Sequence, residues 1–303
     1  MTEANLVEPD ANTAAGASAA APTAPFELHA GALRLAVRAD LGGAVAGLWH
    51  GETPILRSSA PGRLPSAHEA AMFPLVPYSN RLGYRRFRWR GKDHATRANV
   101  AGSPHSLHGL GWQRPWRIVS SSALEVVIEL RHEGDADWPF AFTARQYFAL
   151  SAASFSARLQ LSNDADTDQP IGLGWHPYFV KRPRSRMHIE LSHRWDADAT
   201  LLPTRKVAQH GIDSDLSHLD FDNCFEGWRG PARIRDERFS LQLASSLPYL
   251  VVYTPPERDY FCVEPVSHVS NAIHMAEPAA HGLVALAPGA TFDAWMKLDV
   301  AVL

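Results

Sequence analysis

Apolar and polar side chains alternate along much of this 303-residue chain, and that period of two limits the fold more than any other feature. Such alternation is typical of β-strands with one buried face. The clearest runs are Phe155 to Leu161 and Phe239 to Leu243, whereas helical periodicity is scarce. Other runs are Leu33 to Val37, Phe87 to Arg90, Val126 to Leu130, His188 to Leu191, Tyr249 to Tyr253 and Thr291 to Val302.

Glycines and prolines separate these runs, as expected of turns between antiparallel strands. We therefore expect an all-β fold, a large antiparallel β-sandwich. No change in composition divides residues 26–303, which indicates one domain there. Four connections look long for hairpins, and long connections are often functional or mobile. They are residues 60–85, 92–116, 175–186 and 203–230.

Residues 1–25 differ from the rest in being rich in Ala, Pro, Thr and Ser, with no Lys or Arg before Arg34. A secretory signal needs a basic start and an apolar middle, and a spanning helix needs about 20 apolar residues. Neither pattern is present, so we expect a disordered tail on a cytoplasmic protein.

The charge balance and the cysteine content limit which classes of binding partner we expect and indicate the state of the thiols. The 29 basic and 32 acidic residues nearly balance, so we expect no nucleic acid and no membrane partner, and a small neutral substrate fits better. Cys224 and Cys262 are too few for a disulfide framework, which favours reduced thiols. The sequence leaves a monomer and a homodimer equally open.

Two short strings each place one proton-transfer group in an apolar setting. His176 lies in Gly172-Leu-Gly-Trp-His-Pro-Tyr-Phe179, and Glu264 lies in Phe261-Cys-Val-Glu-Pro-Val-Ser-His268. A histidine and a carboxylate that face each other can give one proton while taking another, as the opening of a ring hemiacetal requires. A hydrogen-bonded core histidine and an exposed strand-end glutamate are the alternatives.

Proline and alternation predict the local setting of both groups. Pro177 favours extended backbone at His176, and Pro265 indicates a strand end or a sheet edge after Glu264. Alternation along this segment puts Cys262 on the same strand face as Glu264. Cys262 either lines the cleft or is merely buried.

Three further polar residues are candidates for ligand binding. Arg81, beside Asn80, can donate parallel hydrogen bonds to hydroxyls, or can be a solvated loop arginine. His108 precedes a glycine and suits a hydrogen-bonding role. Asp222 lies between aromatic residues, where an Asx turn is the alternative.

The sequence does not favour a metal site, a nucleophilic active site or a nucleotide-binding site. His105 and His108 have metal-ligand spacing, but no third ligand is indicated, so we expect no metal. No nucleophile elbow, phosphate loop or complete dinucleotide fingerprint is found, and we expect no cofactor.

Five motifs occur in an order and approximate spacing that resemble the aldose 1-epimerase (galactose mutarotase) family, from about residue 27 to the end. The resemblance is closest to a divergent bacterial branch of that family. The motifs are Asn80-Arg81, Leu107-His108-Gly109, His176-Pro-Tyr-Phe179, Asp222-Asn-Cys-Phe225 and Glu264-Pro265.

The resemblance implies a β-supersandwich with an open cleft and a cofactor-free interconversion of the α and β anomers of a free hexose. It makes His176 the general acid at the ring oxygen and Glu264 the base at the C1 hydroxyl. Arg81, His108 and Asp222 match positions that hold sugar hydroxyls, and Asn80 is a weaker candidate.

Ordinary pKa values lead us to expect an ionised Glu264 and a wholly or partly protonated His176 at neutral pH. Two other functions remain open. A hexose-6-phosphate mutarotase would need a cationic pocket, for which Arg85, Arg86, Arg114, Arg182 and Arg184 are available. A non-catalytic carbohydrate-binding protein would need neither His176 nor Glu264.

Overall fold

The computed structural model describes residues 25–303, so the expected tail at residues 1–25 lies outside the described residues except for Pro25. Residues 25–303 form 26 strands and seven short 3-10 helices, with no α-helix. This confirms the all-β fold. In this part of the chain, no helix has the length and apolar character needed to cross a membrane.

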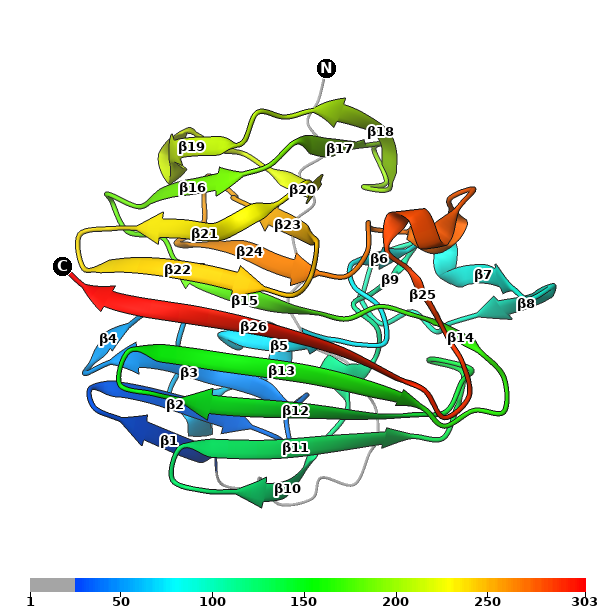
Figure 1. Ribbon diagram of the computed structural model, residues 1–303, viewed down its shortest axis with the longest axis horizontal. Helices are drawn as coiled ribbons and strands as arrows, with labels where there is room; N and C mark the ends of the chain where they lie inside the picture. The colour runs from blue at the N-terminus through cyan, green and yellow to red at the C-terminus, as the bar shows by residue number, and fades with distance from the viewer. Residues whose placement is uncertain (1–24) are drawn as a thin grey trace.

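Two large antiparallel sheets make up most of the fold (Figure 1). The order of the eleven-stranded sheet is β1 (Phe26–Ala30), β2 (Leu33–Arg38), β3 (Ala44–His50), β5 (Met72–Leu75), β15 (Gly174–Val180), β24 (Tyr260–Val266), β23 (Tyr249–Tyr253), β20 (Asp222–Glu226), β17 (His193–Ala197) and β18 (Pro203–Ala208), with β4 (Thr53–Pro54) paired to β3. The order of the nine-stranded sheet is β10 (Arg117–Ser121), β11 (Glu125–His132), β12 (Phe142–Leu150), β13 (Ser154–Asn163), β26 (Thr291–Val302), β22 (Phe239–Ser245), β21 (Arg229–Arg235), β16 (Arg186–Glu190) and β19 (Ile212–Asp215).

Smaller elements join these sheets. Three strand pairs are β14 (Gln169–Ile171) with β25 (Val284–Leu286), β6 (Arg81–Leu82) with β9 (Ser106–Leu107), and β7 (Arg86–Trp89) with β8 (Lys92–Ala95). The 3-10 helices are η1 (Pro61–Arg63), η2 (Ala67–Glu69), η3 (Gly83–Arg85), η4 (Gly111–Gln113), η5 (Leu216–His218), η6 (Ala272–His274) and η7 (Pro278–His281).

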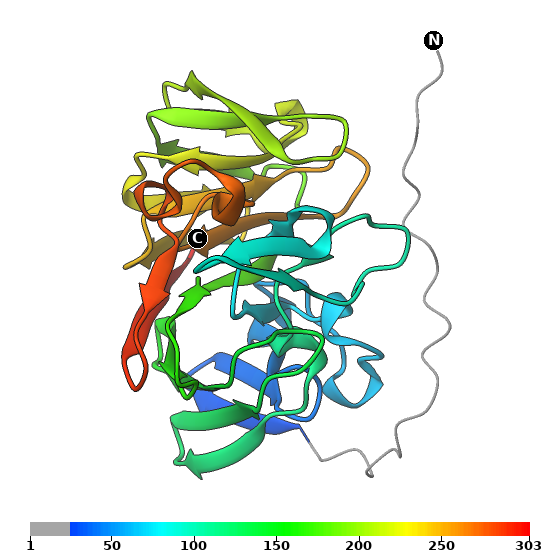
Figure 2. The ribbon, with the colours of Figure 1, turned by 90° about the vertical axis from the view of Figure 1, so that its right-hand side faces the viewer.

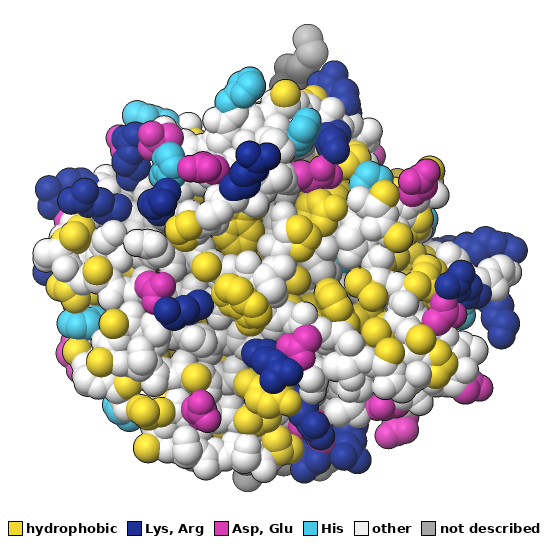
Figure 3. All heavy atoms as spheres, in the orientation of Figure 1, with side chains coloured by type: hydrophobic (Ala, Val, Ile, Leu, Met, Phe, Trp, Pro, Cys, Tyr) yellow, Lys and Arg dark blue, Asp and Glu magenta, His cyan; other side chains and the backbone are white. Residues whose placement is uncertain are grey.

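The main apolar core lies between the two sheets and takes side chains from both, for example Leu48 of β3 and Phe148 of β12. Central strands of the nine-stranded sheet alternate between buried and more exposed positions, as β12 and β13 do along their whole length. Its outer face carries apolar side chains interspersed with charges of both signs (Figure 3). The alternating runs of the sequence therefore predicted this sheet well.

The other face of the eleven-stranded sheet is also covered. Leu64, Ala67 and Trp112, from the connections on either side of residues 72–95, pack against it in a second apolar cluster. These connections, coloured light blue to teal, lie on the right in Figure 2. As a result, every residue of β5 and of β24 is buried.

Two of the expected long connections are wrong. Residues 175–186 begin inside β15, which is covered on both faces and therefore lacks the alternating signal. Residues 203–230 hold three complete strands and the start of a fourth. Pro265 is also not at a sheet edge: it lies within β24, which pairs with β15 on one side and β23 on the other. Residues 60–85 and 92–116 hold only short elements, as expected.

Candidate active site

His176 and Glu264 lie opposite each other on adjacent central strands. Partner pairs Gly174–Val266 and Tyr178–Cys262 flank them, and the constant register between these pairs places His176 across from Glu264. His176 Nε2 is 3.3 Å from Glu264 Oε1. The side chain of His176 is 10% exposed and that of Glu264 is 2% exposed, so the alternative of an exposed strand-end glutamate is wrong.

Aromatic rings fix the imidazole of His176. Phe73, its partner on β5, stacks on it at a centroid distance of 4.8 Å, and Tyr178 stacks at 4.4 Å. Nδ1 of His176 and Oε2 of Glu264 are buried and have no hydrogen-bond partner among residues 25–303. His176 is therefore not an ordinary core histidine whose ring nitrogens are both satisfied.

Burial governs the charge state of the pair. It lowers the pKa of His176 well below its usual value, and the nearby His108, His68 and Arg57 act in the same direction. Burial also raises the pKa of Glu264 well above its usual value, and the neighbouring Asp222 adds to this. The free protein thus favours neutral His176 beside protonated Glu264, not the ion pair expected from ordinary pKa values.

A tight loop presents His108 to the same site. The ring of His108 lies edge-on to that of His176, with centroids 5.2 Å apart. Burial lowers the pKa of His108 to about 3, so its ring is neutral. Its Nδ1 accepts a hydrogen bond from the backbone N–H of Asn80, and the ring proton is therefore on Nε2. Gly109 follows with φ of 68°, and a Cβ there would lie 2.1 Å from the carbonyl oxygen of Val76.

Arg81 and Asp222 form the polar side of the site. Asn80 Oδ1 accepts hydrogen bonds from the backbone N–H and from Nη1 of Arg81, and Ser270 Oγ donates to the same oxygen. Arg81 Nη2 lies 3.5 Å from Asp222 Oδ2. Arg81 is therefore a held side chain and not a solvated loop arginine. Asp222 is part of β20, opposite Tyr253, and not an Asx turn.

The six sequence-predicted residues thus form one cluster. Asn80, Arg81 and Asp222 share the lining of one hollow with Cys224 and Ser270. His108 joins this hollow to the pair, through its hydrogen bond from Asn80 and its ring contact with His176.

Sequence reasoning missed Arg57. Its guanidinium lies 3.7 Å from the ring centroid of Tyr178 and 4.8 Å from that of Tyr260. Nη2 of Arg57 donates to the carbonyl oxygens of His68 and Ala70. No motif surrounds Arg57 in the sequence, so nothing short of the fold could place it near His176.

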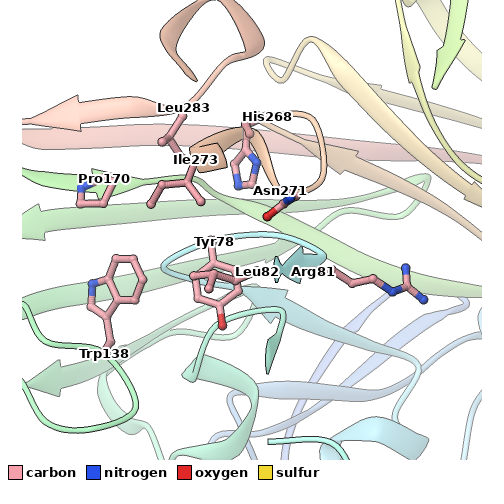
Figure 4. Close-up of a pocket in the computed structure, with 10 residues that line it drawn as sticks. Tyr78, Arg81, Leu82, Trp138, Pro170, His268, Asn271, Ile273 and Leu283 are labelled. Carbon is pink, nitrogen blue, oxygen red and sulfur yellow. The ribbon is translucent and has the colours of Figure 1, made fainter. Parts of the chain in front are cut away.

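A separate, mostly apolar pocket of only about 10 Å³ also has Arg81 in its lining. In Figure 4 the guanidinium of Arg81 points away from Trp138 and Leu283, which line this pocket. His268 lines it too, and both of its ring nitrogens have partners, the backbone N–H of Ser79 and the carbonyl oxygen of Val269. This pocket shares only Arg81 with the six-residue cluster, and the other five residues are absent from its lining, so it is separate from the candidate active site.

The histidine pair with metal-ligand spacing does not form a metal site. His105 Nδ1 accepts a hydrogen bond from the backbone N–H of Tyr84, and its Nε2 lies 3.0 Å from the carbonyl oxygen of Thr200. Within the part of the chain that the structure describes, the one group of three potential metal ligands is His176, Cys262 and Glu264.

Comparisons with known proteins identify the family of this chain. The family model described as aldose 1-epimerase matches residues 26–299. The uncharacterized protein YphB of Escherichia coli is 32% identical over 298 residues, which cover 91% of this chain and 98% of YphB. The crystal structure of a putative aldose 1-epimerase from Escherichia coli is 30% identical, with a TM-score of 0.84, and the match covers 92% of this chain and 99% of that one.

A more distant match extends the likeness in fold. A galactose mutarotase-like protein from Clostridium acetobutylicum is 19% identical, with a TM-score of 0.78. The match covers 91% of this chain and 95% of that one. At this level of identity the likeness concerns the fold alone.

Proposed function

The chain belongs to the aldose 1-epimerase family, and on that premise we propose that it interconverts the α and β anomers of a free hexose. The observation that carries this proposal is the direct contact between His176 Nε2 and Glu264 Oε1. The ring oxygen and the anomeric hydroxyl of a pyranose are both bonded to C1. Two groups that serve them at the same time must therefore be neighbours, as His176 and Glu264 are.

The pair carries one exchangeable proton in either of two forms. Neutral His176 with protonated Glu264 and the ion pair of the two differ only by a shift of this proton across 3.3 Å. In ring opening from the ion pair, Glu264 takes the proton of the C1 hydroxyl and His176 gives one to the ring oxygen as the bond from C1 to that oxygen breaks. This step leaves the neutral pair, which is the form that burial favours.

Ring closure reverses both transfers. After rotation about the bond between C1 and C2, the C5 hydroxyl attacks the other face of the aldehyde. His176 takes the proton of that hydroxyl while Glu264 returns its proton to the aldehyde oxygen. The pair ends as it began, and the reaction consumes no proton and requires no further group.

The other residues hold the sugar in this proposal. His108, with its proton on Nε2, is a donor to a hydroxyl, since Nδ1 is already engaged by Asn80. Arg81 donates and Asp222 accepts, and their mutual contact at 3.5 Å leaves both able to bond hydroxyls in the hollow they line.

Little supports a cationic phosphate pocket. Arg114 is engaged by Asp135 and Asp137, and Arg182 by Asp236. None of the five arginines considered for this role lines the hollow that holds Arg81 and Asp222. A non-catalytic sugar-binding role is also less favoured, because binding alone does not require a buried carboxyl group without a charged partner.

A cytoplasmic location is part of the same proposal. Its support is the state of Cys224 and Cys262, which are buried free thiols, as is typical of proteins in reducing compartments.

Polarimetry tests the proposal. The optical rotation of freshly dissolved α-D-glucose and α-D-galactose is followed with wild-type protein, with Glu264→Gln and with buffer alone. We expect wild-type protein to accelerate the decay of rotation and Glu264→Gln to approach the buffer rate. Acceleration with glucose 6-phosphate alone would favour the phosphorylated substrate, and no acceleration with any sugar would favour a binding protein.

A further inference from the structure

A thiol lies against the acid-base pair. Cys262 comes two residues before Glu264 on β24, so both side chains point to the same face of the sheet. One ligand atom from each of His176, Cys262 and Glu264 can be chosen so that all three lie within 4.8 Å of one another. The proposed anomer interconversion uses only two of these three groups.

Imidazole nitrogen, thiolate sulfur and carboxylate oxygen are the donors that zinc takes in proteins, and three protein ligands with one open position form a common zinc site. Zinc bonds to these donors are about 2.0–2.3 Å long, so two ligands of one four-coordinate zinc ion lie roughly 3.3–3.8 Å apart. The observed spacing of up to 4.8 Å therefore requires the side chains to close by about 1 Å around the ion. A thiolate and a carboxylate also cancel the double charge of the ion, which matters at a buried position.

The polar atoms of this cluster provide a second observation that points to a ligand. Nδ1 of His176 and Oε2 of Glu264 are buried without a hydrogen-bond partner among the described residues, and both residues are more than nine-tenths buried. By contrast, the ring nitrogens of the buried His105 and His268 are all engaged. The unpartnered Oε2 of Glu264 retains the lone pairs that a cation requires, and Nε2 of neutral His176 offers another beside it.

We propose that His176, Cys262 and Glu264 bind one thiophilic divalent cation, Zn²⁺, and that the bound ion blocks the acid-base pair. Metal binding does not depend on the proposed function. Inhibition rests additionally on the proposed function, because an ion that takes the lone pairs of His176 and Glu264 leaves neither residue able to transfer a proton. The ion is an inhibitor of this site and not a cofactor of the reaction.

Cobalt is the probe that tests metal binding without any assay of activity. The full chain without an affinity tag is titrated with Co²⁺ at neutral pH under anaerobic, reducing conditions. We expect one ion per chain, with visible absorption of a four-coordinate site and a thiolate-to-cobalt charge-transfer band in the near ultraviolet, both displaced by Zn²⁺.

Two serine variants identify the sulfur. Cys262→Ser should lose the charge-transfer band, whereas Cys224→Ser should keep it. Cys224 is a matched control because it is also a buried free thiol on the same sheet, opposite Val251, and it lies outside the three-ligand group. Glu264→Gln, which replaces one ligand with a weaker one of the same shape, is the second variant if Cys262→Ser does not fold, and it should weaken Co²⁺ binding.

Inhibition is measured separately. Zn²⁺ should suppress the anomer interconversion by wild-type protein, and a chelator should restore it. Cys262→Ser should raise the half-inhibitory Zn²⁺ concentration at least about 100-fold, since even outer-shell partners of a metal are worth 10- to 100-fold in affinity.

The outcomes separate the two proposals. Any of three results would overturn the metal site. They are the absence of a cobalt spectrum at millimolar Co²⁺, a charge-transfer band that remains in Cys262→Ser, and a charge-transfer band that is lost in Cys224→Ser. A cobalt spectrum with the expected variant pattern, in a protein that accelerates no anomer interconversion, would support the metal site and contradict the proposed function.

Discussion

Two glutamates, one in each large sheet, are equally buried at 2% exposure and differ in every other respect. Glu129 of β11 accepts hydrogen bonds from Arg117, Arg131 and Arg145. Burial opposes its ionisation, but these hydrogen bonds outweigh that effect and lower its pKa to about 2. No arginine donates a hydrogen bond to Glu264 in the described part of the chain, and burial raises its pKa well above the usual value.

The difference lies in what covers each carboxyl group. Glu129 is covered by three arginine side chains that are themselves 43–63% exposed, so its charge lies at the protein surface within an ion network. Glu264 is covered by the protein interior and contacts a histidine whose pKa is also shifted toward the neutral form. Low exposure alone therefore does not identify a reactive carboxyl group; low exposure without a compensating charge does.

The largest expected effect is that of Glu264→Gln. Turnover should fall by about 10²- to 10⁴-fold, the usual contribution of a positioned acid or base. The melting temperature should stay the same or rise, because an amide replaces a buried ionisable group. Glu129→Gln is the matched control and should keep full turnover; a similar loss in both variants would remove the distinction between the two glutamates.

His176→Ala should lower turnover over the same range as Glu264→Gln, because each proton transfer needs both partners. The double variant should lose little more than either single variant, since residues that act as a unit are not additive. Turnover is measured by polarimetry on all three variants. If the double variant lost turnover by the product of the two single-variant factors, the two residues would act separately.

Arg81→Ala should reduce kcat/KM by about 10- to 100-fold, mainly through KM. A hydrogen bond to a charged group is worth about 1.5–3 kcal/mol, which corresponds to that range. Arg88→Ala is the control, because Arg88 pairs with Asp93 at an exposed position away from the site. An effect on kcat alone would indicate that Arg81 acts on the reacting atoms and not on binding.

The buried histidines and Glu129 should affect the stability of the fold in different ranges of pH. Burial lowers the pKa of His108 to about 3 and that of His268 to about 4, whereas both are near 6.5 when unfolded. The unfolded chain therefore binds more protons as pH falls below about 6.5, and stability declines by up to about 1.4 kcal/mol per pH unit for each proton. The loss associated with Glu129 begins only below about pH 4.5, where its unfolded carboxyl group protonates, and ends near pH 2.

Urea unfolding between pH 7 and pH 3.5 measures this dependence. The free energy of unfolding of wild-type protein should fall as pH drops below about 6.5. Glu129→Gln should change this profile only below about pH 4.5. A flat profile from pH 7 to pH 5 would contradict the burial of His108 and His268 in their neutral forms.

The smallest expected effect is the loss of stability in Glu129→Gln at neutral pH, about 1 kcal/mol. The arginines around Glu129 are substantially exposed, so water screens the network and its contribution is modest. Urea unfolding at pH 7 measures it, with Glu264→Gln as the comparison. A larger loss in Glu264→Gln than in Glu129→Gln would reverse the expected order.

The same contrast between the sheets explains what the sequence could predict. β13 and β22 have one face toward the core and one toward solvent, so their alternation was readable. β15 is buried on both faces over six of its seven residues, and the sequence-based interpretation took most of it for a connection. The register that places His176 opposite Glu264 depends on pairing between strands about ninety residues apart, which no local pattern encodes.

Individual site residues were predictable to different degrees. His176 and Glu264 came from their unusual surroundings in the sequence, and Arg81, His108 and Asp222 from the chemistry of their side chains. The family motifs then gave these residues, with Asn80, their roles in one site. Their charge states could not be predicted, because burial by residues from distant segments sets the pKa values. Arg57 could not be found at all, since it reaches Tyr178 only through the packing of the folded chain.

The most direct test is exchange NMR of the anomeric protons at equilibrium, with equal concentrations of wild-type protein, Glu264→Gln and Glu129→Gln. The exchange rate between the α and β anomers of galactose and of glucose is measured above the rate in buffer. We predict rapid exchange for wild-type protein and Glu129→Gln, and exchange near the buffer rate for Glu264→Gln. Undiminished exchange in folded Glu264→Gln would contradict the assignment of the buried, uncompensated carboxyl group as a proton-transfer partner.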